Sequence, residues 1–472
     1  MSKSTDVRIV AAELYFLPIP FRIPLKFGRE VTTEGTCARV HLTIEDRLGR
    51  RCIGWGESPL AVVWGWPSLL TYNERHERMK QLCRDLVQSW PRVLRFGHPI
   101  ELSYDFQQLE FVGLIKDISE NEAEPISHLA ALLCLAPFDL ALHDAYGQLH
   151  QRDIYRCYDA EWMNRDLASY FKDLHEPGVD FQNKYPVDFL ASSPLKKLPV
   201  WHLVGGLDPL DESEVSGPTP NDRLPVTLLE WIEQDQLDCL KVKLRGNDAD
   251  WDYQRLLKVG QIAIDHDVHW LSADFNCTVT EPSYVNEILD QLSVEHPQIF
   301  ARIAYVEQPF PYDLDAFPID VHSVSSRKPL YLDESAHDWR YVRKGRKLGW
   351  SGVALKTCKT QSGALLSLCW AKSHGMPLMV QDLTNPMLAQ IPHVRLAAHA
   401  ETICGVESNG MQFCPAASDC EAKVHPGLYQ RRNGVLDLST LEGAGFGYQL
   451  DKIERELPQR DSLTEYQTEK IV

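Results

Sequence analysis

The stretch Leu240-Lys241-Val242-Lys243-Leu244 is a short apolar run that carries two lysines. In a β-strand, residues i and i+2 point to the same face, so Lys241 and Lys243 project together while Val242 points away. Apolar runs that end in a functional side chain recur downstream at Leu271-Ser-Ala-Asp274, Ala304-Tyr-Val-Glu307, Leu330-Tyr-Leu-Asp333, Val353-Ala-Leu-Lys356 and Leu378-Met-Val-Gln381. From Lys241 onward, the functional positions are 33, 33, 26, 23 and 25 residues apart, about one strand plus its return helix. This rhythm predicts an α/β barrel.

The C-terminal ends of barrel strands converge on one mouth, so side chains far apart in sequence meet there. Asp274, Glu307 and Asp333 are therefore expected to form a cluster of three carboxylates. Such a cluster needs a cation, and an all-oxygen ligand set favours Mg²⁺ over Zn²⁺. With Lys241 and Lys243 on one side and Lys356 on the other, the formal charge including the ion is +2. The predicted site therefore attracts an anion.

Each motif also has a plainer interpretation. A Lys-x-Lys pair is usually part of a solvated face, and one acidic residue after an apolar run is most often a helix N-cap. Five charged positions in consecutive strand–helix units, in the order Lys-x-Lys, Asp, Glu, Asp, Lys, are hard to explain as independent caps. The conjunction favours a functional site.

This order of residues resembles the enolase superfamily, and within it the muconate-lactonizing-enzyme subgroup. Further matching segments span most of the chain, and they are Gly54-Trp55-Gly56-Glu57, Pro137-Phe-Asp139-Leu-Ala-Leu-His-Asp144, Asp274-Phe-Asn276, Val306-Glu307-Gln308-Pro309, Leu332-Asp333-Glu334-Ser335 and Gly443-Ala-Gly445-Phe-Gly447. The related mandelate-racemase subgroup uses a histidine on the seventh barrel strand, where this chain has Gln381. The resemblance implies a modified TIM barrel of the (β/α)7β type with an α+β capping domain.

The resemblance also implies roles for single residues. Lys243 would be one acid/base and Lys241 its tuning partner, while Lys356 would be the acid/base on the opposite face. Asp274, Glu307 and Asp333 would be the Mg²⁺ ligands. A like charge at Lys241, partial burial and the metal are expected to lower the pKa of Lys243 toward neutral pH.

We predict four parts along the chain. Residues 1–150 form the α+β cap, because residues 7–46 alternate as strands and a turn at 48–50 leads into a strand that ends at Glu57. An insertion at 151–197, the barrel at 198–425 and a C-terminal segment at 426–472 that packs back on the cap follow. The acidic stretch 207–223 comes after the first barrel strand and is either a lid or, more simply, a solvated loop.

Composition limits the class of protein. A formal net charge of −18 argues against nucleic acid and anionic membranes as partners. The twelve cysteines are scattered without a Cys-x-x-Cys pair, and the first residues lack the apolar core of a signal peptide. We expect a cytoplasmic protein with a small-molecule carboxylate as its partner. The oligomeric state is open, and a homo-oligomer is compatible with the sequence.

The predicted function is a Mg²⁺-dependent racemase or epimerase that removes the proton α to a carboxylate through an enediolate. A dehydratase or cycloisomerase of the same superfamily and, from a different class, a non-catalytic binding protein are the alternatives. Two cap segments, 25–29 and 60–66, match the positions of the family's specificity loops, and Trp64 and Trp66 are candidates for an apolar wall.

The identity of the substrate rests on weaker signals. Where dipeptide epimerases carry Asp-x-Asp, this chain has Glu407-Ser408-Asn409, and Gln381 and Asp382 make the seventh strand end polar. The sequence favours a polar or hydroxylated acid over a dipeptide, and it leaves racemisation and elimination open.

Overall fold

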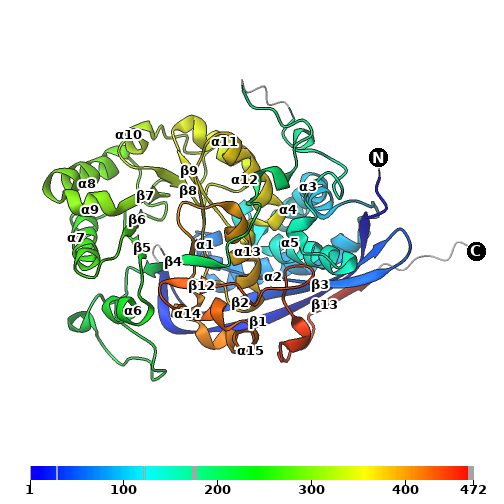
Figure 1. Ribbon diagram of the computed structural model, residues 1–472, viewed down its shortest axis with the longest axis horizontal. Helices are drawn as coiled ribbons and strands as arrows, with labels where there is room; N and C mark the ends of the chain where they lie inside the picture. Colours follow the sequence, from blue (N-terminus) through cyan, green and yellow to red (C-terminus); the bar gives the residue numbers. More distant parts are fainter. Residues whose placement is uncertain (1, 28–29, 121, 123, 173–177, 466–472) are drawn as a thin grey trace, which may run out of the picture.

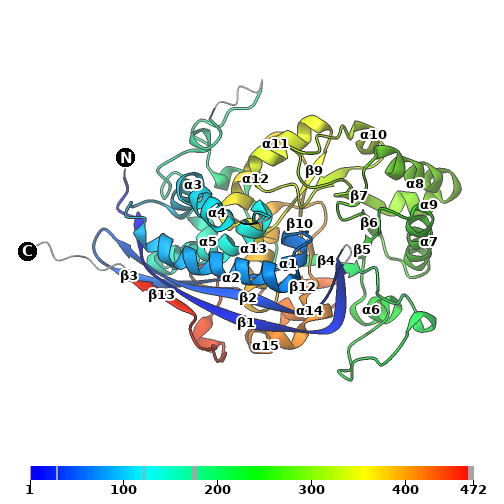
Figure 2. The same cartoon turned by 180° about the vertical axis from the view of Figure 1, so that it is seen from behind.

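The computed structural model describes residues 2–27, 30–120, 122, 124–172 and 178–465. A barrel, coloured green to orange, lies beside a long antiparallel sheet, coloured mostly blue, and helices of the first 150 residues cover the face of the sheet next to the barrel (Figure 1). The same arrangement is seen from behind, with the sheet along the lower edge of the molecule (Figure 2).

Parallel strands form the barrel. In the described part of the chain there are eight, namely β4 (Lys197–Val204), β5 (Cys239–Lys243), β6 (Trp270–Asp274), β7 (Ile303–Glu307), β8 (Leu330–Leu332), β9 (Gly352–Leu355), β10 (Leu378–Val380) and β11 (Val406–Glu407). Neighbours from β4 to β10 pair in chain order, and β11 pairs with β4. The backbone N–H of Ile403, just before β11, donates to the Leu378 carbonyl of β10 at 3.0 Å. The sheet therefore curls into the predicted barrel.

Helices connect successive strands, which gives the (β/α)7β order that the resemblance implied. They are α6 (Leu228–Asp235), α7 (Ala249–Asp265), α8 (Pro282–Glu295), α9 (Pro297–Arg302), α10 (His322–Ser325), α11 (Trp339–Leu348), α12 (Gln361–Ser373) and α13 (Gln390–Ala400). Local sequence sets their ends. Thr227 and Glu230 form a capping box at the start of α6, and Gly349 ends α11 with a φ of 107°.

The cap contains the predicted strands and helices. Its antiparallel sheet has the order β13–β1–β2–β3, with β1 (Val7–Phe27), β2 (Glu30–Asp46), β3 (Arg51–Pro59) and, from the C-terminal end, β13 (Ser462–Glu465). The β2–β3 turn contains Gly49 with a φ of 78°, a conformation that favours glycine. Its helices are α1 (Val62–Gly65), α2 (Tyr72–Ser89), α3 (Pro99–Leu109), α4 (Phe111–Ser119) and α5 (His128–His150).

Two glycines of the Gly54-Trp55-Gly56-Glu57 motif let β3 lie directly on α5. A Cβ atom at Gly54 would stand 2.1 Å from the backbone nitrogen of Ala145, and one at Gly56 would stand 2.0 Å from the carbonyl oxygen of Pro137. Real Cβ atoms do not approach other heavy atoms so closely. The motif therefore has a packing role between the sheet and the helix.

Helix α5 joins the cap to the rest of the protein. The Asp139 carboxylate accepts hydrogen bonds from the Ser362 backbone at 3.0 Å and hydroxyl at 2.7 Å, at the start of α12. Asp144 accepts from the backbone N–H groups of Trp55 at 3.0 Å and Phe446 at 3.1 Å. By length and composition alone α5 could cross a membrane, but its apolar window is entirely buried inside the protein.

The C-terminal part of the chain packs against both the barrel and the cap sheet. Short elements follow the barrel, namely α14 (Gly410–Phe413), α15 (Asp419–Val424), α16 (Pro426–Tyr429) and β12 (Val435–Asp437). Strand β12 pairs with β4, and β13 pairs with β1 of the cap. Between α5 and β4 the described chain forms short 3₁₀ turns at Ile154–Arg156, Leu167–Ser169 and Pro186–Phe189. The predicted division at 150, 197 and 425 stays a prediction.

Candidate active site

Strand β5 delivers two lysines to the barrel mouth. Lys241 and Lys243 alternate with Val242, and Lys241 is buried with 2 % of its surface exposed, whereas Lys243 keeps some exposure. The ammonium group of Lys243 contacts the Asp274 carboxylate at 2.5 Å and lies 5.6 Å from the centroid of the Phe27 ring. Lys243 therefore stands between the barrel and the cap.

The three predicted carboxylates follow on the next three strands. Asp274 and Glu307 are register partners at the ends of β6 and β7, and Asp333 comes directly after β8. All three are buried. Asn276 supports Asp274 by donating to it from its backbone at 2.9 Å and from its side chain at 2.7 Å. Parallel strand ends thus bring together residues up to 59 positions apart.

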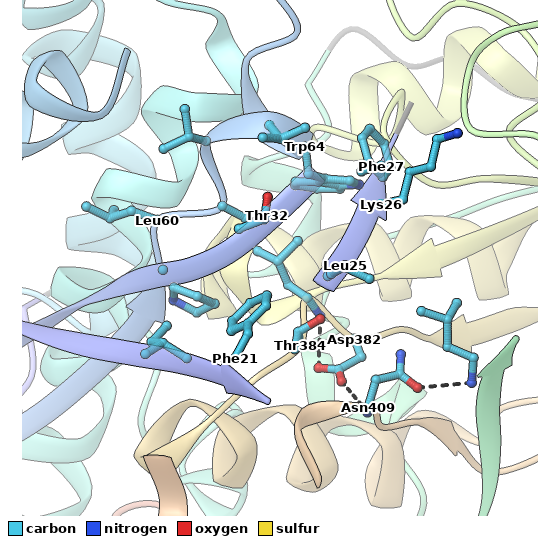
Figure 3. A pocket seen from close by; sticks show the side chains of 18 of the residues that line it. Phe21, Leu25, Lys26, Phe27, Thr32, Leu60, Trp64, Asp382, Thr384 and Asn409 are labelled. Carbon is cyan, nitrogen blue, oxygen red and sulfur yellow. Dashed lines mark hydrogen bonds between the residues drawn. The ribbon is translucent and has the colours of Figure 1, made fainter. Parts of the chain in front are cut away.

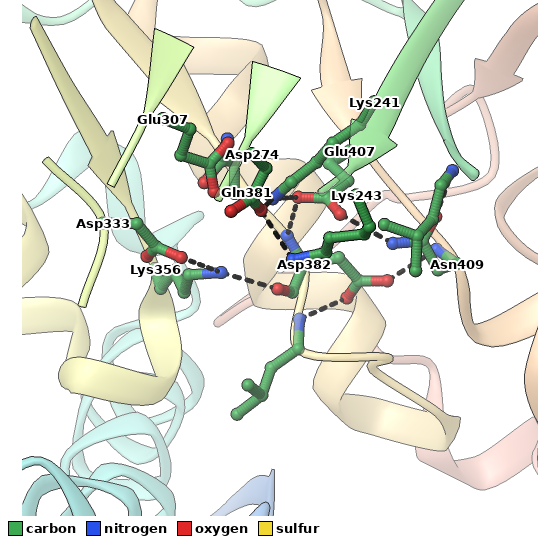
Figure 4. Close-up of polar contacts among 12 residues, drawn as sticks. Lys241, Lys243, Asp274, Glu307, Asp333, Lys356, Gln381, Asp382, Glu407 and Asn409 are labelled. Atoms are coloured by element: carbon green, nitrogen blue, oxygen red, sulfur yellow. Dashed lines mark hydrogen bonds and ion pairs between the residues drawn. The ribbon is translucent and has the colours of Figure 1, made fainter. Parts of the chain in front are cut away.

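Lys241 is the centre of an ion cluster (Figure 4). Its ammonium group lies 2.7 Å from Glu307, 3.1 Å from Asp274 and 3.1 Å from Glu407. Burial alone would lower the pKa of Lys241, but these carboxylates raise it well above its usual value. Lys241 is therefore held as a buried ammonium.

Lys356 follows β9 and reaches the other side of the mouth. Its ammonium group lies 3.2 Å from Asp333 and donates to the Asp382 carbonyl at 2.7 Å. The Trp64 ring of α1 lies 5.1 Å away. Burial would lower the pKa of Lys356, but Asp333 raises it above the usual value.

A cavity of about 110 Å³ lies over these groups, between the cap and the barrel mouth (Figure 3). Lys243 and Lys356 both border it, together with Lys241 and Asp333. Its cap side is formed by the ends of β1 and β2 and by the segment around α1. A small molecule in this cavity would have a lysine from β5 on one side and a lysine following β9 on the other.

Comparison with known proteins agrees with this architecture. Residues 226–454, which include β5 to β11, match the enolase C-terminal domain-like family. This part of the chain belongs to the enolase superfamily. The predicted resemblance to its mandelate racemase and muconate lactonizing enzyme group is thereby confirmed. A search of the curated proteins finds no match.

Solved structures of enolase-superfamily proteins share the fold over nearly the whole chain. An N-succinyl Arg/Lys racemase from Bacillus cereus is 17% identical over 97% of this chain and 100% of its own, with a TM-score of 0.62. A dipeptide epimerase from Cytophaga hutchinsonii, complexed with Mg and D-Ala-L-Val, is 17% identical over 94% and 97%, with a TM-score of 0.59. A muconate lactonizing enzyme from Pseudomonas fluorescens, complexed with muconolactone, is 16% identical over 93% and 96%, with a TM-score of 0.57. The predicted fold class is confirmed.

The donor chemistry of the enolase-superfamily site fits a hard divalent cation. Among the described residues, no three acidic, histidine or cysteine side chains are already spaced as ligands of one ion, and ammonium groups instead contact the predicted ligands. Carboxyl groups still outnumber ammonium groups in this cluster. Burial, Asp274 and Asp333 together raise the pKa of Glu307 well above its usual value, although Lys241 opposes the rise.

A second sign of missing positive charge is an oxygen of Glu334. Its Oε2 atom is buried without a hydrogen-bond partner, while Oε1 accepts from the Trp64 indole at 2.9 Å. Burial and the neighbouring Asp333 and Asp274 raise the pKa of Glu334 to about 7. The cluster contains more carboxyl groups than ammonium groups. The six carboxyl groups are those of Asp274, Glu307, Asp333, Glu334, Asp382 and Glu407, and the four ammonium groups are those of Lys241, Lys243, Lys356 and Lys359. With all six carboxyl groups ionised, a divalent cation would bring the formal charge of the site to zero and not to the +2 expected from the sequence, because Glu334, Asp382 and Glu407 add three negative charges and Lys359 adds one positive charge.

Sequence reasoning missed two members of this cluster. Lys359 is buried, contacts the Asp333 carbonyl and carboxylate, and lies 5.6 Å from the Trp64 ring. Glu334 is the other. Lys359 falls three residues after Lys356 in one helical turn, and Glu334 is adjacent to Asp333, so nearness to a predicted residue was the available signal.

The residues proposed to select the substrate have other partners. The Gln381 amide donates to Glu307 and Tyr305, and Glu407 accepts from Lys241 and from the Asn409 amide at 2.8 Å. The two tryptophans differ. Trp64 lines the cavity, whereas the Trp66 indole donates to Glu124 at 3.2 Å within the cap. Of the segment 25–29, residues 28 and 29 lie outside the described residues.

Proposed function

We propose that this protein is an enzyme, a Mg²⁺-dependent racemase or epimerase that moves the proton α to a carboxylate. The observation that carries the proposal is the cavity bordered by Lys243 and Lys356 from different strands, above a buried carboxylate cluster. Two acid/base groups on opposite faces of one carbon are what a 1,1-proton transfer requires. The family match and the names of the structural neighbours support the same reaction class.

The two lysines have complementary tasks. One, as the neutral amine, takes the α proton, and the other, as the ammonium, returns a proton to the opposite face. Lys356 is suited to begin as the ammonium, because Asp333 holds its pKa above the usual value. Asp274, Glu307 and Asp333 would hold the cation, which when bound would stabilise the negative charge that develops on the substrate carboxylate. Lys241 holds Asp274 and Glu307 in place as their shared counter-ion.

A lyase of the same superfamily is the second candidate. Elimination or lactone opening needs the same removal of an α proton, but the opposite lysine then protonates a leaving group instead of the carbon. The structural likeness to a muconate lactonizing enzyme complexed with muconolactone favours this alternative. A non-catalytic binding protein would retain the cavity and lose proton transfer. We also propose a cytoplasmic location, supported by twelve free cysteines among the described residues.

The decisive test is isotope exchange in deuterated water with Mg²⁺ and a panel of carboxylic acids. Deuterium at the α carbon with no other mass change identifies an isomerase, and loss of water or lactone formation identifies a lyase. Lys243→Ala and Lys356→Ala should each abolish racemisation, and each should keep exchange on the face served by the remaining lysine. Lys258→Ala, which alters an exposed lysine on α7, is the matched control. Full activity of Lys356→Ala would exclude the two-base mechanism.

The cation has its own test. Mg²⁺ should raise the melting temperature of the protein, because a ligand that binds only the folded state stabilises it by RT ln(1 + [L]/Kd), about 2.7 kcal/mol at a hundredfold excess over Kd. The triple variant Asp274→Asn, Glu307→Gln, Asp333→Asn should lose the response. A Mg²⁺-dependent shift that persists in this variant would refute the ligand assignment.

A further inference from the structure

The wall of the cavity on its cap side is mainly apolar, and its polar residues include Lys26, Thr32 and Thr36. Ile19, Phe21, Leu25 and Phe27 from β1 line it, together with Leu60 and Trp64 from the segment around α1 (Figure 3). Buried apolar surface favours an apolar partner by about 25 cal/mol per Å². The cap side of the cavity therefore offers dispersion contacts to an apolar group of a ligand and buries it from water.

A long irregularity in the β1–β2 hairpin creates this wall. Pairing is regular from Ala11, opposite Thr43, to Pro20, opposite Glu34, and resumes at Leu25, opposite Thr32, so five steps on β1 match two on β2. The extra residues bend the end of the hairpin toward the barrel mouth. In a regular hairpin, successive side chains would point alternately toward and away from the barrel mouth.

An arginine in the irregular segment fixes the bend against the barrel. The Arg22 guanidinium contacts the Asp222 carboxylate through Nε at 2.5 Å and through Nη2 at 3.0 Å. It also donates to the carbonyls of Pro225 at 3.2 Å and Gln412 at 3.4 Å. The wall is thus tied to the loop that follows β4.

Asp382 and Asn409, two of the polar residues on the barrel side of the cavity, are already engaged. The Asp382 carboxylate accepts three backbone N–H groups, from Leu383 at 2.8 Å, Asn385 at 2.9 Å and Asn409 at 2.5 Å. The Asn409 side chain bridges Glu407 and the Leu203 backbone. These groups shape the cavity but have little capacity left to bind substrate hydroxyls. This differs from the polar substrate favoured by the sequence.

A second, larger cavity of about 710 Å³ adjoins at Lys26 and Lys243. Polar and charged side chains line it, including Arg245 and Asn276. Among its described lining residues Lys243 is present, but Lys356 and Asp333 are not. The reacting part of a substrate held between the two acid/base lysines must therefore lie in the first cavity, which both lysines border.

We propose that the substrate is a carboxylic acid whose distal part is an uncharged apolar group, seated between the barrel mouth and the β1–β2 hairpin. This inference rests on the proposed function for the placement of the reacting carboxylate. The distal group itself is selected by the cap. Each methylene that becomes buried should improve binding about fourfold, from about 0.8 kcal/mol per CH₂.

The test uses pairs of acids that differ only at the far end, in the presence of Mg²⁺. N-butanoyl-L-alanine is compared with N-succinyl-L-alanine, and 2-methylhexanoate with 2-methyladipate, so that a terminal methyl replaces a terminal carboxylate. Binding is measured by calorimetry and α-proton exchange by mass spectrometry in deuterated water. We expect at least tenfold tighter binding of the apolar member in each pair.

Two neighbouring positions on β2 provide matched variants. Thr32 lines the cavity, whereas the adjacent Val31 is 52% exposed and is not among its lining residues. Thr32→Lys should weaken binding of the apolar acids by tenfold or more and reduce the preference within each pair, while Val31→Lys should leave both unchanged. Since both variants add the same charge to the same strand, the difference isolates the cavity.

The outcomes separate this inference from the proposed function. The apolar subsite is overturned if the diacids bind more tightly, or if none of the four acids binds. One outcome is that the apolar acids bind preferentially, that Thr32→Lys abolishes this preference, and that neither exchange nor product formation occurs. This outcome supports the subsite and refutes the proposed catalysis. Exchange that is faster on the diacids supports the catalysis and refutes the subsite.

Discussion

Replacing Lys241 by methionine should destabilise the protein strongly while preserving side-chain length. The ammonium group contacts three buried carboxylates, with distances of 2.7 Å to Glu307 and 3.1 Å to both Asp274 and Glu407. Removing one partner of a buried ion pair costs about 3–5 kcal/mol, because a desolvated charge is left uncompensated. The three contacts share one ammonium and do not add. We therefore expect the free energy of unfolding to fall by about 3–5 kcal/mol in EDTA.

The assay is urea unfolding followed by circular dichroism, with and without Mg²⁺. Lys258→Met is the control, because Lys258 is exposed and its ion pair with Glu214 at 3.4 Å should contribute less than about 1 kcal/mol. Mg²⁺ should restore part of the stability of Lys241→Met, since a cation can neutralise the stranded carboxylates. A loss no larger than that of the control would refute the role of Lys241 as their counter-ion.

Lys241 itself should stay protonated throughout the neutral range. The carboxylates raise the pKa of Lys241 well above its usual value, so its contribution is fully present below the pKa of an unfolded lysine, about 10.4. That contribution is lost only as the pH rises through the still higher pKa of the folded state. The protonation of Lys241 should therefore add no pH dependence to the stability of the wild type from pH 6 to 9, and any pH dependence of the difference reports the carboxylates that Lys241 contacts.

Two further predictions concern the cap. Burial raises the pKa of Asp144 to about 7, above the value of about 3.9 in an unfolded chain, so ionisation should lower the free energy of unfolding by up to about 4 kcal/mol as the pH rises from 4 to 7. Asp144→Asn should lack this slope in urea unfolding at several pH values, and parallel curves for the two proteins would contradict it. Gly56→Ala should destabilise by about 1–3 kcal/mol or more, because its Cβ would stand 2.0 Å from the Pro137 carbonyl. Gly113→Ala, in open space on α4, should be neutral or stabilising in the same melting assay, and equal effects would refute the packing argument.

The sequence was sufficient for the barrel and for the candidate residues. Strand alternation fixes that Lys241 and Lys243 share a face, and the regular spacing of apolar runs fixes where strands end. Parallel strand ends meet at one mouth in any such barrel, so the convergence of Asp274, Glu307 and Asp333 followed without coordinates. The catalytic and ligand roles of these residues stay predictions.

Tertiary structure decided what those side chains touch. No local sequence pattern indicates that Lys241 contacts Glu407, which lies 166 positions later. From the sequence, the amide of Gln381 was free to bind substrate, but in the structure it donates to Glu307 and Tyr305. Such pairings depend on the closure of the barrel, which no local pattern encodes.

The character of the substrate cavity depends on tertiary structure in the same way. An irregular segment between Pro20 and Leu25 turns apolar residues of the hairpin toward the mouth, and Arg22 holds them there through Asp222, 200 residues away. Local sequence specifies strands and their faces through a period of two, but a break in register resets that period. The face on which Phe21 and Leu25 end, and therefore the chemistry of the wall, was decided only by the folded cap on the folded barrel.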